Sequence, residues 1–183
     1  ADRMWQAIYR PQARYVQASA EATESLIVFG NGPFMIAENQ KKTGLAFRAF
    51  HMNSCGFEAD ADGLVNKFKY DEELTANQAI GRWGEKNLHP KVIEAANDAK
   101  KADQPFCFTH VIVPRDDYEF GRYDMRGFAF RKCVIDVKHE HKVEETGYHD
   151  FPIAVRRWET APGEVYARSP GMMALPDAKT LQA

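Results

Sequence analysis

The regular alternation of side chains over residues 128–137 most constrains the fold of this chain. Successive side chains of an extended strand point to opposite faces, so Phe128, Phe130 and Val134 share one face. A second run, residues 106–113, is rich in β-branched and aromatic residues and ends at Pro114. The stretch between the two runs is polar and carries tyrosines. It predicts a loop that joins two strands of an antiparallel sheet.

Other short runs extend this sheet. Residues 60–63 read DADG, a turn signal in which Gly63 supplies the freedom for a positive φ. The runs on either side of this turn, residues 56–59 and 64–70, predict an antiparallel hairpin, and residues 142–145 extend a hairpin beyond residue 137. The other predicted strands are residues 34–39, 45–52 and 153–158.

Helical spacing appears in three places before the final segment. Residues 12–29 predict an amphipathic helix that follows a short helix over residues 3–10 and ends at the sequence GNGP. The apolar positions of this helix are Val16, Ala20, Thr23 and Ile27. Two shorter helices are predicted over residues 74–84, with Thr75 or Asp71 as the cap, and over residues 90–101.

These elements predict an α+β fold. We expect a leading helix, a twisted antiparallel sheet or small barrel, and two inserted helices in a single domain over residues 1–183. Residues 160–171 are rich in Pro and Gly, and they predict a loop before a last helix that starts near Met172.

Composition excludes several classes of protein. The formal net charge is -2, so nothing in it demands nucleic acid or an anionic membrane as a partner. The three cysteines are widely spaced, which favours reduced thiols in a protein made in the cytoplasm over a disulfide framework or a zinc site. No apolar stretch approaches the roughly 20 residues of a membrane span, and no signal peptide is recognisable.

Histidines offer the strongest alternative to a structural role. His139 and His141 would share a face of a strand, and with His149 they could bind a metal in a metal-dependent enzyme. However, they lie in the charged run of residues 138–145, which is typical of a solvated hairpin. We therefore expect no metal and no cofactor.

Other candidate catalytic patterns are weaker. The carboxylates Asp103, Asp116, Asp117, Glu119 and Asp124 do not have the spacing of an EF-hand and favour a polar loop. The serines have no nucleophile-elbow context, and the sequence GNG at residues 30–32 is too short for a phosphate-binding loop. No enzymatic activity is predicted.

Arginine and aromatic residues gather near the C-terminal part of the chain. These types dominate protein interfaces, and with a net charge near zero they favour a protein interface over nucleic acid. A single-stranded nucleic-acid binder that uses Phe128 and Phe130 is a further hypothesis. The predicted interface residues are Arg156, Arg157, Trp158, Tyr166 and Arg168.

Three blocks of this region form longer motifs. Residues 147–158 read GYHDFPIAVRRW, residues 162–171 read PGEVYARSPG, and residues 174–181 read ALPDAKTL. They resemble the bacteriophage head-to-tail connecting (portal) family of short-tailed phages, with its motifs y-x-x-F-P-x-x-x-x-R-W, G-E-x-Y-G-R-S-P and A-L-P-D-x-K-x-L-N. Residues 24–32, 58–71 and 110–115 resemble its d-l-x-x-F-G-n/t-G, D-x-x-G-x-V and H-x-V-x-P-R in the same order. The resemblance covers nearly the whole chain.

The resemblance implies a structural subunit of a portal ring, the head-to-tail connector through which DNA is packaged and ejected. It implies a homo-oligomer, commonly a dodecamer, that contacts capsid or scaffold protein, terminase and tail proteins. DNA would pass through the channel without sequence-specific binding, and no membrane is involved. The protein would be made in the bacterial host cytoplasm, with a prophage as one source, and would reside in the virion at the portal vertex.

Two departures from the family pattern bear on this interpretation. Ala167 stands where the family has Gly, and a positive φ there would cost on the order of 1 kcal/mol. The chain also stops where the family continues, which predicts a fragment: the wing-like region, with residues 172–183 starting a helix toward a missing stem. The five interface residues would then brace the junction between wing and stem.

Overall fold

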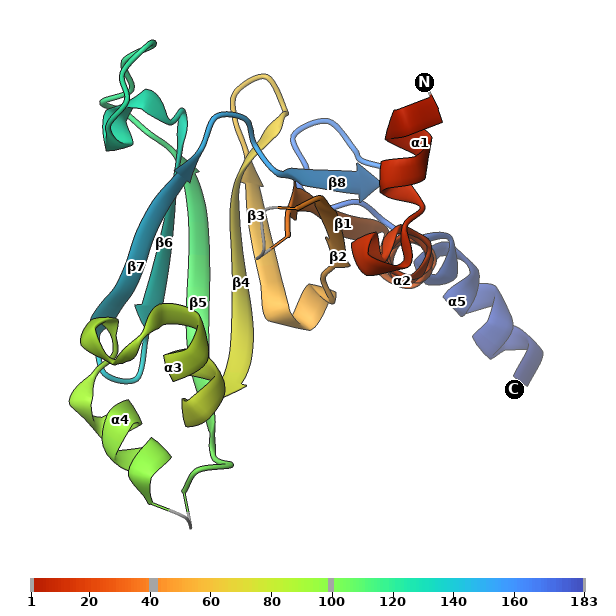
Figure 1. Cartoon of the computed structure of the whole chain (residues 1–183). Coiled ribbons are helices and arrows are strands. Elements are labelled where there is room, and N and C mark those ends of the chain that lie inside the picture. Colours follow the sequence, from red (N-terminus) through yellow and green to blue (C-terminus); the bar gives the residue numbers. More distant parts are fainter. Residues whose placement is uncertain (1, 40–42, 99–100, 183) are drawn as a thin grey trace. The chain divides into compact units, whose positions relative to one another are not determined.

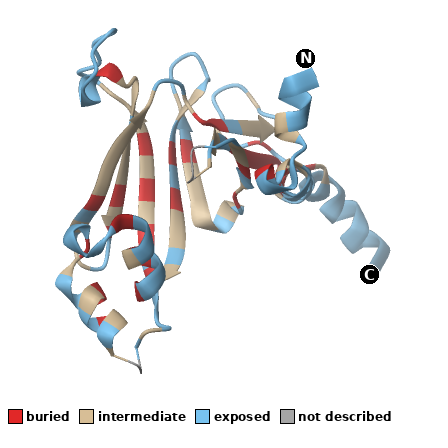
Figure 2. Ribbon diagram, in the orientation of Figure 1, coloured by how far each residue is buried: buried red, intermediate tan, exposed pale blue. Residues whose placement is uncertain are grey.

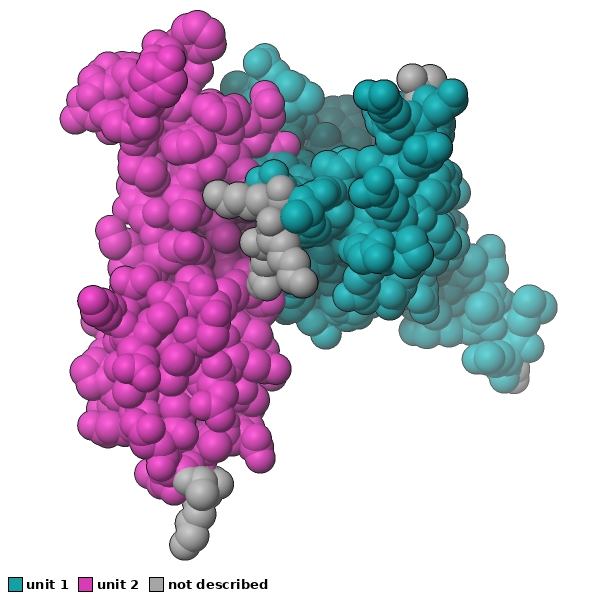
Figure 3. Space-filling model, in the orientation of Figure 1, with its two compact units in different colours: residues 1–65, 152–183 teal, residues 66–151 magenta. Residues whose placement is uncertain are grey.

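The computed structural model describes residues 2–39, 43–98 and 101–182. Helices and antiparallel strands are mixed along the chain, which confirms the α+β class (Figure 1). The chain divides into two compact units, residues 1–65 with 152–183 and residues 66–151 (Figure 3). That the two units together form a single domain stays a prediction. No helix in the described ranges is both long and apolar enough to cross a membrane.

Unit 1 is built on a small antiparallel sheet. Its strand order is β2-β1-β8, so the central strand pairs with a neighbour in sequence and with a strand more than 100 residues later. Phe34 of β1 faces Ala49 on one side and Ala154 on the other. The elements are α1 Asp2–Ile8, η1 Pro11–Ala13, α2 Tyr15–Phe29, β1 Asn31–Glu38, β2 Leu45–Ala49, η2 Met52–Ser54, β3 Cys55–Ala59, β8 Ile153–Arg157 and α5 Pro170–Gln182.

Helix α2 buries a different face from the predicted one. Val16 and Ile27 are 66% and 50% exposed, whereas Ala18 and Ala22 are buried. A Cβ atom on Gly32 would lie 2.3 Å from the carbonyl oxygen of Ala22, so helix and strand approach too closely for larger side chains. The sequence pattern therefore predicted the wrong buried face of α2. The buried face carries small residues because the backbones of helix and strand are in near contact.

The predicted turn over residues 60–63 is present. Gly63 has a φ of 78°, and its amide donates to the carbonyl oxygen of Asp60 at 3.0 Å. The Asp60 carboxylate accepts hydrogen bonds from the amides of Asp62 and Leu64, as expected of an Asx turn.

Unit 2 is an antiparallel sheet with two helices inserted between its first two strands. The strand order β4-β5-β6-β7 follows the sequence, and the described strands form an open sheet in place of the small barrel considered above. The elements are β4 Val65–Thr75, α3 Ala76–Trp83, η3 Glu85–Asn87, α4 Pro90–Asn97, β5 Pro105–Pro114, η4 Met125–Gly127, β6 Phe130–Asp136 and β7 His141–Tyr148. Residues 99 and 100, part of the predicted second helix, lie outside the described residues.

Local sequence explains where the inserted helices begin. Thr75 caps α3 by accepting from the amide of Gln78, and the Gln78 side chain accepts from the amide of Thr75. This reciprocal capping box confirms Thr75 as the predicted cap. Helix α4 starts with Pro90 at its first position, where a missing N–H costs nothing.

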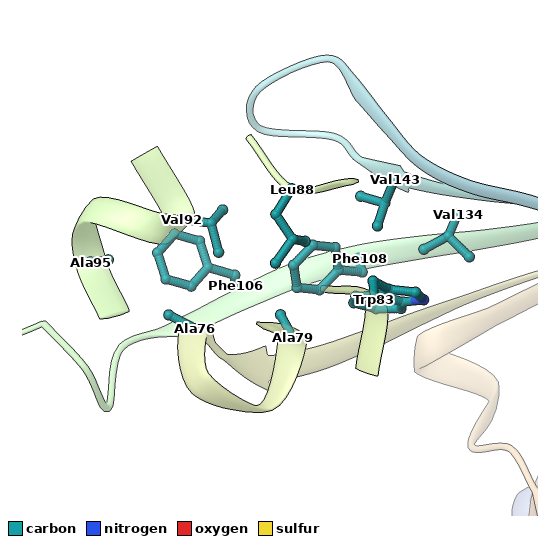
Figure 4. Packing of buried hydrophobic residues seen from close by; sticks show 10 residues of the cluster. All are labelled: Ala76, Ala79, Trp83, Leu88, Val92, Ala95, Phe106, Phe108, Val134 and Val143. Carbon is teal, nitrogen blue, oxygen red and sulfur yellow. The ribbon is translucent and has the colours of Figure 1, made fainter. Parts of the chain in front are cut away.

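The core of unit 2 lies between these helices and the sheet. Burial alternates along β5 as far as Val113, as the alternating colours of this strand show (Figure 2). Phe106 and Phe108 are among its buried residues. The Trp83 ring at the end of α3 lies 4.8 Å from the Phe108 ring, and its indole N–H donates to Glu144 of β7 at 3.3 Å. Figure 4 shows the full cluster: Ala76, Ala79, Trp83, Leu88, Val92, Ala95, Phe106, Phe108, Val134 and Val143.

One histidine is fully buried in unit 2. His110 of β5 stacks on Tyr70 of β4, with ring centroids 4.3 Å apart. Its Nε2 lies 3.0 Å from Oε2 of Glu72, which pairs with Arg82, but neither ring nitrogen makes a well-aligned hydrogen bond within the described residues. Burial lowers the pKa of His110, although the Glu72 carboxylate acts in the opposite direction.

Phe108→Ala should destabilise the protein by about 3–5 kcal/mol, because it leaves a cavity against Trp83. The matched control is Phe120→Ala, since Phe120 is 93% exposed, and it should change stability by less than about 0.5 kcal/mol. Urea denaturation measures both. Equal stability of the two variants would contradict the core assignment.

His110 should also make the protein sensitive to acid. Because its pKa is lowered on folding, the unfolded chain binds a proton more readily, so stability is full above the ordinary value of 6.5 and falls as the pH drops below it. His110→Gln removes this titration. Its free energy of unfolding should fall less than that of the wild type between about pH 7 and pH 5.5 in urea titrations. Parallel pH curves for the two proteins would contradict this role of His110.

Candidate functional site

The predicted interface residues lie in unit 1, on a segment that is tied to the corner between α2 and β1. The centre of this corner is Asn31, which is 2% exposed. Its Oδ1 accepts from the amide of Ala167 at 2.9 Å, and its Nδ2 donates to the carbonyl oxygens of Ala167 and Phe29 at 3.2 and 3.0 Å. One buried side chain thus holds a segment that lies 136 residues further along the chain.

Two serines and a glycine complete the attachment. Ser25 Oγ donates to the carbonyl oxygen of Asn31 at 2.8 Å. Ser169 Oγ donates to the carbonyl oxygen of Val28 at 2.7 Å and accepts from the amide of Met172 at 2.9 Å, which caps the start of α5. Gly30 has a φ of 76°, and a Cβ atom there would lie 2.5 Å from the Ala167 carbonyl oxygen. The corner therefore requires glycine at this position.

Ala167, which stands where the family has Gly, causes no backbone strain. Among the described residues, positive φ at a position other than glycine occurs at Arg14 and Glu140, and Ala167 is not among them. Ala167 is buried, and its amide and carbonyl both pair with Asn31. The cost considered for a left-handed alanine therefore does not arise.

Strand β8 directs its two arginines to different neighbours. The Arg156 guanidinium lies 5.3 Å from the centre of the Phe34 ring and reaches the hydroxyls of Thr23 and Ser19 on α2 at 3.3 and 3.5 Å. Arg157 donates to the carbonyl oxygen of Gly63 at 2.8 Å. Both arginines therefore make contacts within unit 1 that hold β8 to α2 and to the turn.

The other three predicted residues present more surface. Trp158 is 53% exposed, and its backbone amide donates to the carbonyl oxygen of Gly30 at 2.9 Å. Tyr166 packs on Phe57, and its hydroxyl accepts from the Phe57 amide at 3.2 Å. Arg168 pairs with Glu164 on the surface. The five residues thus share one region, and among the described residues no hydrogen bond or ion pair joins one of their side chains to another.

The histidines are not arranged as the metal hypothesis requires. His139 lies in the turn between β6 and β7, with its Nδ1 2.7 Å from Oδ2 of the buried Asp136. His141 at the start of β7 has its Nε2 3.0 Å from the carbonyl oxygen of Asn87. The His139 contact lies within the β6–β7 connection, and the His141 contact attaches the start of β7 to the η3 segment.

A third histidine near this pair was not predicted. The His89 ring stacks on His139 with centroids 4.6 Å apart, whereas His149 lies against Phe128 instead. Nowhere in the described ranges do three or more His, Cys, Asp or Glu side chains form a group that could hold a metal ion. The geometry gives no support to a metal-dependent enzyme.

The remaining candidates also have structural surroundings. Of the carboxylates, Asp117, Glu119 and Asp124 pair with arginines of their own loop. Phe128 is covered by His149 and Phe130 by Phe151, so neither ring is an open platform for a nucleic-acid base.

Comparison with known proteins points to the same family as the sequence motifs of this region. The family model described as "Bacteriophage head to tail connecting protein" matches residues 1–183. The chain belongs to this family. It is 28% identical over 126 residues to a probable portal protein of Bordetella phage BPP-1, covering 68% of this chain and 22% of that protein. It is 26% identical over 161 residues to the portal protein of Salmonella phage epsilon15, covering 86% of this chain and 29% of that protein.

In this head-to-tail connecting protein, the sequence motifs pointed to residues of this region but not to the side chains that support them. Asn31 and Ser25 look like helix-end residues, and Ser169 has only a following proline to mark it. The signal that could have found Asn31 is its place between two glycines, where a polar side chain at a helix end often bonds to backbone. Its distant partner is invisible to any local pattern.

Asn31→Ala should cost about 1–3 kcal/mol, because it leaves the buried amide of Ala167 without a partner. Hydrogen exchange should also speed up at the amide of Ala167. The control is Asn53→Ala, since Asn53 is exposed, and it should change neither quantity. Unchanged exchange at Ala167 in the Asn31 variant would contradict the proposed attachment.

Proposed function

We propose that this chain is the wing-like region of a portal subunit, a structural part of the ring through which phage DNA is packaged and ejected. The observation that carries the proposal is the family match over residues 1–183. The chain spans less than a third of the curated portal proteins that it matches, 22% and 29%. We therefore propose that the complete protein continues into a stem, and that residues 172–183 begin the helix that leads there.

The geometry of unit 1 supports a role in assembly. Trp158 and Arg168 expose their side chains, while their backbone amides donate to the carbonyl oxygens of Gly30 and Glu159 at 2.9 and 2.8 Å. Exposed aromatic and arginine side chains on a fixed backbone lose little entropy on association and are the usual anchors of protein interfaces. We assign these residues, with Arg156, Arg157 and Tyr166, to the junction between wing and stem.

The charge of the chain supports passage of DNA without tight binding. With a net charge of -2, the chain is not a strong polycation. It would make few contacts with DNA phosphates, so the duplex could slide past it. The role is structural and not enzymatic. The partners are other copies in a ring, commonly of twelve, together with capsid or scaffold protein, terminase and tail proteins at the portal vertex of the virion.

The full-length protein should form closed rings that are visible by negative-stain electron microscopy. Trp158→Ala combined with Arg168→Ala should lower the yield of rings several-fold, because it removes interface anchors without touching the core. Thermal unfolding should be nearly unchanged, since the Arg168–Glu164 pair is exposed.

The control for this test is Val137→Ala, which truncates an exposed side chain of unit 2 and should leave ring yield unchanged. A full-length protein that stays monomeric in every condition tried would overturn the portal proposal. Normal ring yield in the double variant would overturn only the assignment of the junction residues.

A further inference from the structure

The loop between β5 and β6 displays two aromatic side chains with almost no cover. Phe120 is 93% exposed and Tyr123 is 107% exposed on the relative scale. The loop lies at the end of the sheet away from α3 and α4 (Figure 1), and Figure 2 shows most of it as exposed. Two fully exposed aromatic side chains within four residues offer apolar surface that binding to a partner would bury.

A network of ion pairs links the residues of this loop. Arg122 donates to Asp124 through Nε at 3.1 Å and to Glu119 through Nη1 at 2.8 Å. Arg126 lies 3.4 Å from Asp117 and 3.6 Å from Glu119. These contacts with Arg122 hold the pKa of Asp124 below its ordinary value, so the carboxylate stays charged at neutral pH.

The backbone of the loop closes on itself as well. The amide of Glu119 donates to the carbonyl oxygen of Arg126 at 3.0 Å, and a Cβ atom on Gly127 would lie 2.0 Å from the carbonyl oxygen of Arg122. Arg115, with a side chain only 8% exposed, lies 3.5 Å from Glu145 of β7 and anchors the base. The aromatics are therefore presented on a preorganised support, which reduces the entropy cost of binding.

The tip of the loop, residues 116–126, has a net negative charge. Four carboxylates, Asp116, Asp117, Glu119 and Asp124, outnumber the two guanidinium groups of Arg122 and Arg126, which gives a net charge of -2. Asp116 is exposed and has no ion pair among the described residues. The tip therefore fits a basic surface with room for aromatic rings.

Unit 1 carries a groove with these properties. Its volume is about 1090 Å³, and its charged lining residues are Arg10 and Arg14. The uncharged lining is mixed: Ala7, Ala13, Gly44 and Leu45 are small or apolar, and Gln12, Asn39 and Thr43 are polar. Arginine can stack on an aromatic ring as well as pair with a carboxylate, so this lining suits both features of the tip.

We propose that the tip of this loop docks into the Arg10–Arg14 groove of a second copy of the chain. The proposal deepens the portal function and rests on it, because it names a contact by which subunits join. The two patches differ and lie in different parts of the sequence, so the contact is heterologous, as a ring requires.

Charge distinguishes this groove from a second one in unit 1. The second groove, of about 490 Å³, is lined by Glu21 and Glu24 together with Val28, Phe29 and Phe50. Its apolar lining would accept an aromatic ring, but its two carboxylates would repel the tip. The Arg10–Arg14 groove is therefore the better receptor.

The contact can be located by photo-crosslinking in the full-length protein. A photoreactive phenylalanine analogue replaces Phe120, and copies labelled with heavy and light isotopes are mixed before assembly and irradiated. We expect mixed heavy–light adducts between residues 116–122 and the tryptic peptides of residues 4–14 or 43–48. The same analogue at Leu64, an exposed position in unit 1, should not label these peptides.

A charge exchange tests the electrostatic part of the proposal. Asp116→Arg or Arg10→Glu alone should lower the crosslink yield about threefold to tenfold, because each sets like charges together. The double variant restores opposite charges and should recover most of the yield. A double variant as weak as the worse single variant would show that Asp116 and Arg10 do not meet and would overturn the docking of the tip at Arg10.

The outcomes separate this inference from the portal function. Rings that form normally while the analogue labels other peptides, another protein or only its own copy would overturn the docking contact and leave the portal function standing. A wild-type protein that forms no rings would overturn both.

Discussion

The architecture of unit 1 depends on the buried amide of Asn31. A buried polar side chain without partners costs free energy, so this amide is stable in the interior only while its hydrogen bonds are made. Its partners are the backbone of Phe29 and of Ala167, 136 residues away. Arg168 follows Ala167 in the chain, and the amide of Trp158 donates to the carbonyl oxygen of Gly30, next to Asn31. The positions of these exposed side chains therefore follow from an interaction in the interior.

Features encoded by neighbouring residues could be predicted from the sequence. The capping box at Thr75–Gln78 and the turn at Asp60–Gly63 each span four residues. The alternation of β5 follows from a period of two. Each of these depends on backbone geometry over one or two turns, which the rest of the chain does not alter. The open form of the sheet, by contrast, depends on strand ends that no local pattern records.

Features set by distant partners could not be predicted. The inward face of α2 is decided by Gly32, whose hydrogen lets the strand approach Ala22 so closely that only small residues fit between them. An apolar pattern alone therefore selected the exposed side of the helix. The candidate site shows the same division, because the residues of the C-terminal motif were recognisable while the support from Asn31 and Ser25 was not.

The loop at residues 115–127 shows how a subunit can expose aromatic rings without losing specificity. Arg122 and Arg126 pair with carboxylates of the same loop, and its backbone closes on itself between Glu119 and Arg126. Phe120 and Tyr123 are therefore displayed on a folded loop. The net negative tip disfavours contact between two identical loops, which would make a closed dimer. A contact between unlike patches leaves one donor and one receptor free after each addition, so subunits continue to add until the rotation closes the ring.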